Sequence, residues 1–159
     1  MTEKKNDQRI GARSRIGGFK DIEWIMNSTK STIAKEDDLR SPMAVAIRVG
    51  GNHQVDPVKS LIILLVTVEY IKNYNSENKT ILLSYTNEAS FEIENFTEVI
   101  TLNSDGTYAV PGELLEVFVG VTISTIRGIL IAKTANSDLQ EIHIPIIPNV
   151  RELIQSWNQ

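Results

Sequence analysis

Two histidines are the side chains in this chain whose ordinary pKa suits acid–base catalysis near neutral pH. His53 lies in a Gly-Asn turn signal and His143 stands near Pro145 in an apolar segment, so the two share no motif. The spacings of a zinc protease, a serine hydrolase and a phosphate-binding loop are all absent from the sequence. The residue types therefore predict a protein that is not an enzyme.

An acidic run at Glu36, Asp37 and Asp38 has the oxygen chemistry to ligate a divalent cation. It lacks the spaced ligands and the glycine of a calcium loop, which favours a solvated run of charges instead. Three glycines between Gly11 and Gly18 follow no predicted strand and open no helix, which argues against a nucleotide-binding loop. Because the chain has no cysteine, it has no disulfide and no thiolate metal site. We expect no metal and no cofactor.

Length and composition indicate one soluble globular domain, with 159 residues, 42% hydrophobic and 23% charged. The formal charge of −4 gives no reason to expect nucleic acid as a partner. Residues 1–18 are basic and glycine-containing, which predicts a disordered tail ahead of a single α+β domain at 19–159. The N-terminus has charges but no apolar stretch after them, so we expect no secretory signal and a cytoplasmic protein.

The segment Pro111–Ala135 is predicted to be a long helix that is apolar on every side. Proline at the start suits a first helical turn, and the apolar residues cover more than one stripe. One face must pack on this subunit's sheet, and we expect the other to pack on a second copy of the chain. A membrane span is the competing interpretation, but Glu116 and Arg127 lie within the run, and a charge at mid-bilayer costs about 3 kcal/mol or more.

Alternating patterns predict strands at Phe19–Met26 and at Met43–Val49, the latter closed by Gly50-Gly51-Asn52. Val55–Ile71 gives the longest strand signal. Further strand segments follow at 81–85 and 91–96, with a bulge or turn at 87–90 between them. After the long helix, a proline-containing extended segment at 139–148 leads to a short helix capped by Asn149. The predicted fold is α+β, a four-stranded antiparallel sheet followed by a long and a short helix on one face.

Short motifs in this order resemble the SecB family of protein-export chaperones. The similar parts are Lys-Asp-Ile-Glu-Trp-Ile at 20–25, Leu-Leu-Val-Thr-Val-Glu-Tyr at 64–70, and the helix, proline loop and helix at the end. The resemblance extends over Phe19–Trp157. It implies an ATP-independent holdase that binds unfolded or pre-export polypeptides and hands them to the SecA motor. It also implies a homotetramer, a dimer of dimers whose long helices pack between two sheets.

The resemblance assigns two kinds of site residue. For the motor, Asp21 matches a docking acid of the family, while Ile25 stands where a second acid is common and Glu23 is a substitute. The oligomer interface is expected on one face of the long helix, at Phe118, Val119, Thr122, Ile123, Ile126 and Ile129. The chain also lacks the family's acidic C-terminal tail, so holdase action is better supported than delivery to the motor. The alternative function is an accessory subunit of another secretion or conjugation assembly, with one dedicated partner.

An apolar groove between the sheet and the proline segment is the expected client site, since unfolded chains share exposed apolar side chains but no sequence. Its expected lining is Trp24, Leu39, Leu82, Tyr85, Phe91, Leu139, Ile142, Ile144 and Pro145. The competing interpretation is that these residues simply fill the core.

Overall fold

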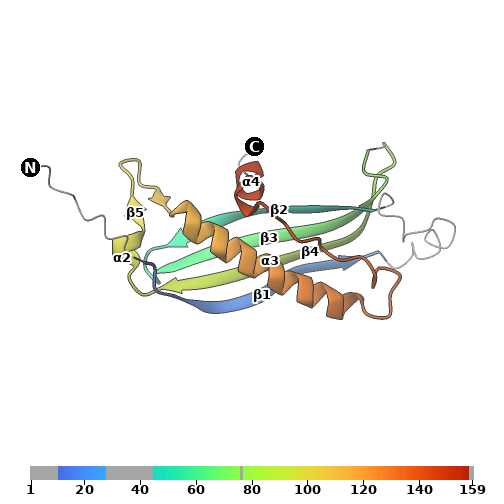
Figure 1. Ribbon diagram of the computed structural model, residues 1–159, viewed down its shortest axis with the longest axis horizontal. Helices are drawn as coiled ribbons and strands as arrows, with labels where there is room; N and C mark the ends of the chain where they lie inside the picture. The colour runs from blue at the N-terminus through green and yellow to red at the C-terminus, as the bar shows by residue number, and fades with distance from the viewer. Residues whose placement is uncertain (1–10, 28–44, 76, 158–159) are drawn as a thin grey trace, which may run out of the picture.

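A four-stranded antiparallel sheet forms the centre of the protein (Figure 1). The computed structural model describes residues 11–27, 45–75 and 77–157. The strands are β1 (Ser14–Met26), β2 (Val45–Asp56), β3 (Leu61–Lys72) and β4 (Thr80–Ile93), and they lie side by side in the order β1-β4-β3-β2. Strands β1 and β2 are therefore the two edges of this sheet. The acidic run at 36–38 and the predicted groove residue Leu39 lie outside the described residues.

Two helices cover one face of the sheet. The long helix α3 (Gly112–Thr134) crosses the sheet diagonally, and the short helix α4 (Val150–Ser156) sits over β2 (Figure 1). Between β4 and α3 the chain forms the one-turn helix α2 (Phe96–Val99) and a small hairpin, β5 (Thr101–Leu102) with β6 (Tyr108–Ala109). The predicted α+β fold class, with an antiparallel four-stranded sheet followed by a long and a short helix, is confirmed.

Alternation along β3 builds the core beneath the helices. Every second residue of β3 is fully buried on the helix side, while the residues between them are half-buried on the other face. The register places buried β4 residues beside them, so that Ile62 lies opposite Phe91 and Val68 opposite Tyr85. The core is thus a layer between the helix side of the sheet and the buried face of α3.

Several strand boundaries differ from those predicted. Strand β1 begins at Ser14 inside the expected tail, and Arg15 there donates to the Glu92 carboxylate at 2.8 Å. The long signal at 55–71 is divided by a turn, in which the Asp56 carboxylate accepts from the backbone N–H of Val58 and Lys59, both at 3.1 Å. Neither turn is visible as periodicity, because side chain to backbone bonds create both boundaries.

Two predicted interruptions are continuous strand. Strand β2 runs through Gly50 and Gly51, and β4 runs through Asn87, where a bulge or turn was expected. Strand β4 has a hydrogen-bonded neighbour on each side, and these ladders hold weak strand formers in line. The irregularities lie instead in β1, at residues 16–18 and 21–23, and beside Tyr70 in β3.

Helix α3 begins after Pro111 and ends before Ala135, close to the predicted limits. Its buried side chains face the sheet, and the buried hydroxyls of Thr122 and Thr134 donate to helix carbonyls one turn back, each at 2.8 Å. The expectation that one face of the helix packs on this subunit's own sheet is confirmed. By length and composition, α3 is also apolar enough to cross a membrane.

Candidate polypeptide-binding surface

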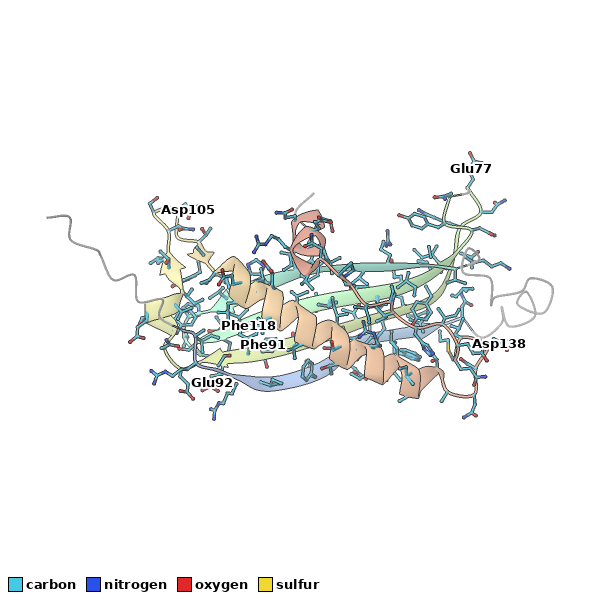
Figure 2. The ribbon with its side chains drawn as sticks, viewed as in Figure 1. Glu77, Phe91, Glu92, Asp105, Phe118 and Asp138 are labelled. Atoms are coloured by element: carbon cyan, nitrogen blue, oxygen red, sulfur yellow. The ribbon has the colours of Figure 1, made fainter. Side chains whose placement is uncertain are left out.

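Most of the predicted groove residues lie in the core of the subunit. Leu82, Tyr85, Phe91, Leu139 and Ile144 are all buried. The rings of Phe91 and Phe118 stack face to face with centroids 4.1 Å apart, between β4 and α3 (Figure 2). For these five, the structure supports the competing interpretation of core packing. Trp24 and Ile142 are half-buried and Pro145 is exposed, so these three remain accessible.

The segment 139–148, which we call the lid, is attached to the domain mainly through its carbonyl groups. The Tyr70 hydroxyl donates to the Ile142 carbonyl at 3.0 Å. Arg127 donates to the carbonyls of Ile144 and Pro145 at 2.9 and 2.8 Å. Within the described residues, no backbone N–H from 143 to 148 joins a backbone ladder. The lid is therefore an extended strand held by side chains, and Ile146 on it is 85% exposed.

Arg127 is a site residue that the sequence interpretation missed. Its charge was evident in the apolar helix, but its partners come from a segment a full turn of chain later, so no local pattern indicated them. The same holds for Tyr70, whose burial raises its pKa to about 12 and keeps its hydroxyl protonated as a donor to the lid.

An aromatic and charged cluster lies beside the C-terminal end of α3. The rings of Trp24 and Tyr85 meet edge to face with centroids 5.8 Å apart. The ammonium group of Lys133 lies over both rings, 5.0 Å from the centroid of Trp24 and 5.8 Å from that of Tyr85. Asp21 accepts from the Tyr85 hydroxyl and pairs with Lys133 at 2.9 Å. These contacts link β1, β4 and α3.

Electrostatics in this cluster keep Asp21 ionised and Tyr85 neutral. The hydrogen bond from Tyr85, and then the one from Lys133, lower the pKa of Asp21. Burial, and then the hydrogen bond to Asp21, raise the pKa of Tyr85. The charges of Asp21 and Lys133 therefore offset each other at neutral pH.

The two acids expected to dock a motor lie on opposite faces of the sheet. Asp21 pairs with buried Asn87 on the helix side, whereas an irregularity in β1 pairs Glu23 with Thr86 on the other face. The expected placement of Asp21 on the solvent face is wrong, because the β1 bulge between these residues reverses the alternation. Asp21 and Glu23 do not form one patch.

The expected oligomer interface is largely core as well. Phe118, Val119, Thr122, Ile123 and Ile126 are buried against this subunit's own sheet, and Ile129 is half-buried. The sequence could not choose between the two faces of α3, since both are apolar. The structure turns a different set of residues outward, among them Val117 and Ile131, which are 60% and 47% exposed.

The accessible members of the predicted groove come together at one end of the sheet. Trp24 lies opposite Tyr85, which lies opposite Val68 of β3, and the lid residue Ile142 is bound by Tyr70, two residues further along β3 on the same face. We call Trp24, Ile142, Pro145 and Ile146 the lid-end surface. It offers apolar contact and an extended backbone without a fixed polar constellation, and in the described residues no group of His, Asp or Glu is placed to hold a metal ion.

Comparisons with known proteins give distant structural likenesses. Neither a protein-family profile nor a curated protein sequence matches this chain. Among solved structures, the chain is similar to the SecB-like chaperone Rv1957 of Mycobacterium tuberculosis, in complex with a peptide from the HigA1 antitoxin. That likeness has a TM-score of 0.49 and 11% identity, and it covers 85% of this chain and 91% of the other.

A second likeness is to a protein of unknown function from Streptococcus agalactiae. It has a TM-score of 0.39 and 7% identity, and it covers 87% of this chain and 99% of the other. With TM-scores below 0.5, neither likeness assigns this chain to a family.

Proposed function

We propose that this protein is an ATP-independent holdase chaperone that binds unfolded or pre-export polypeptides at the lid-end surface. The observation that carries the proposal is the attachment of the lid, which is fixed by side-chain bonds to three of its carbonyls while Ile146 stays in solvent. An extended apolar segment held in this way can contact an unfolded chain through side chains and free backbone N–H groups. Such contacts need area and adaptability more than a client sequence.

The resemblance to SecB supports the remaining parts of the proposal. They are a cytoplasmic location, assembly as a homotetramer, and polypeptide rather than nucleic acid as the ligand. The exposed apolar face of α3 supports self-association, because a face of this kind is unusual on a soluble monomer. Delivery to the SecA motor has less support, since Asp21 is engaged by Lys133 and Tyr85.

Suppression of aggregation tests the proposal directly. A chemically denatured test protein is diluted into buffer without nucleotide, and light scattering is followed with increasing amounts of the full chain. We expect Ile146→Asp to weaken suppression several-fold, because it places a charge where apolar contact is required. Val58→Asp is the matched control, since Val58 is 91% exposed in the turn between β2 and β3, far from the lid in sequence.

The outcome separates this function from its alternative. A chaperone should hold several unrelated unfolded proteins, whereas an accessory subunit should bind one partner at fixed stoichiometry. No suppression at a several-fold excess of the chain over any test protein would contradict the holdase proposal.

A further inference from the structure

The outward face of α3 is exposed to solvent, yet its polar groups are already satisfied within the subunit. The Ser124 hydroxyl donates to the Gly120 carbonyl at 2.8 Å, and the Thr125 hydroxyl donates to the Val121 carbonyl at 3.0 Å. Such a surface can be buried without leaving unpaired donors or acceptors.

The charged side chains that flank this face are also engaged inside the subunit. Glu116 pairs with Arg151 of α4 at 2.6 Å, and Arg127 donates to the lid carbonyls. Between Glu113 and Ala135, no charged side chain lies on the stripe that contains Val117, Ser124 and Ile131. Burial of this stripe therefore separates no charge from its partner.

The stripe has the same pattern of residue sizes in both directions from Ser124. Glycines lie four residues before and after it, at Gly120 and Gly128, and β-branched residues lie seven before and after it, at Val117 and Ile131. Steps of four and seven residues return to nearly the same side of a helix. A Cβ atom added at either glycine would meet no atom within 4 Å, so nothing in the subunit requires a glycine at these positions.

We infer that α3 packs antiparallel against α3 of a second copy of this chain, with the twofold axis passing at Ser124. In that arrangement Gly120 of one copy lies opposite Gly128 of the other, and Val117 lies opposite Ile131. A twofold interface requires a self-complementary surface, which this sequence of sizes provides. Small residues at the centre let the two backbones approach closely, and the antiparallel helix dipoles attract.

A second copy fits this face better than a lipid bilayer does. The buried residues of α3 pack on the subunit's own sheet, so the helix would have to leave its core to span a membrane. In Figure 1 no other element lies over the outward side of α3, which leaves room for a helix of the same length. The inference rests on the proposed function only in that both include self-association, and it specifies the partner, orientation and axis.

A single-cysteine variant tests the position of the axis. Because the chain has no cysteine, Ser124→Cys carries one thiol, and a residue on a twofold axis meets its own copy. We expect Ser124→Cys to form a disulfide-linked dimer under mild oxidation in high yield. Val58→Cys, equally accessible in a distant turn, should cross-link at least about tenfold more slowly. Equal rates would overturn the inference.

Glycine variants test the close approach. Gly120→Leu and Gly128→Leu each raise helix propensity and meet open space in the subunit, so the fold should persist, with unchanged circular dichroism. They should weaken self-association at least about tenfold in sedimentation experiments. Gly112→Leu is the matched control, because it also meets open space but lies off the stripe.

Three results would count against the inference. They are a monomeric unmutated chain at tens of micromolar, self-association unchanged in both glycine variants, and recovery of the protein with lipid vesicles in place of self-association. Suppression of aggregation is measured separately, so its failure with intact cross-linking would overturn the proposed function and leave this interface standing.

Discussion

The ammonium group of Lys133 lies 2.9 Å from the carboxylate of Asp21 and joins the last turn of α3 to the edge strand β1. In the described sheet, β1 pairs with β4 alone, so this contact and the hydrogen bond from Tyr85 fasten an edge strand to the helix layer. Edge strands without such contacts are the first to fray.

Removal of the Lys133 charge should loosen β1. Lys133→Met keeps the apolar stem but loses the ion pair and the contact with the Trp24 ring, so we expect the free energy of unfolding to fall by about 1 kcal/mol. Urea denaturation measures the change, and Lys59→Met is the control, because Lys59 is an exposed partner of Asp56 at 3.9 Å. Equal losses in both variants would show that the Lys133 contacts add nothing beyond surface charge.

Acid should remove the contribution of Asp21. Its partners Tyr85 and Lys133 lower its pKa in the folded protein below the value of 3.8 expected without them. The ionised carboxylate therefore stabilises the fold above about pH 4, and this stabilisation is lost as the pH falls through the lower, folded-state pKa. The difference in unfolding free energy between the unmutated chain and Asp21→Asn should shrink between pH 6 and pH 2, as a difference that is constant over this range would contradict.

The contact between Gly51 and Trp157 should fix α4 on the sheet. A Cβ atom at Gly51 would lie 2.6 Å from the Leu65 carbonyl oxygen and 3.2 Å from the Trp157 ring. We expect Gly51→Ala to lower the free energy of unfolding by about 1–3 kcal/mol and to expose Trp157, seen as a red shift of its fluorescence in a Trp24→Phe background. Gly50→Ala, where nothing lies within 4 Å, should leave both measurements near those of the parent.

Adjacent residues of α3 should differ sharply in what truncation costs. Phe118→Ala removes a ring stacked on Phe91 in the core and should cost about 3–5 kcal/mol of stability. Val117→Ala, on the exposed side, should change the stability of the subunit by no more than about 0.5 kcal/mol. A reversed order in thermal or urea unfolding would mean that the other face of α3 is the buried one.

Binding to the SecA motor should be weak and sensitive to salt, or absent. Asp21 is already paired, Glu23 lies on the opposite face, and exposed charge pairs contribute only about 0–1 kcal/mol each. Titration of the motor at low and physiological salt measures this. Tight binding that persists in Asp21→Asn and Glu23→Gln would show that another surface docks the motor.

Local patterns in the sequence determined the fold class and the main element types. Alternation predicted the strands, Pro111 marked the start of α3, and Asn149 predicted the cap of α4, where its side chain accepts from the Glu152 N–H at 3.2 Å. Each of these signals depends on residues within one turn or one strand, so a single sequence is enough to see them.

Only the tertiary structure decided what the apolar surfaces do. Helix α3 is apolar on both sides, so composition could not tell that Phe118 faces the sheet and Val117 faces solvent. One irregularity in β1 sent Asp21 and Glu23 to opposite faces, and the partners of Asp21 and Arg127 come from distant segments. The physical reason is that side-chain periodicity fixes relative directions within an element, whereas long-range packing chooses which direction is buried.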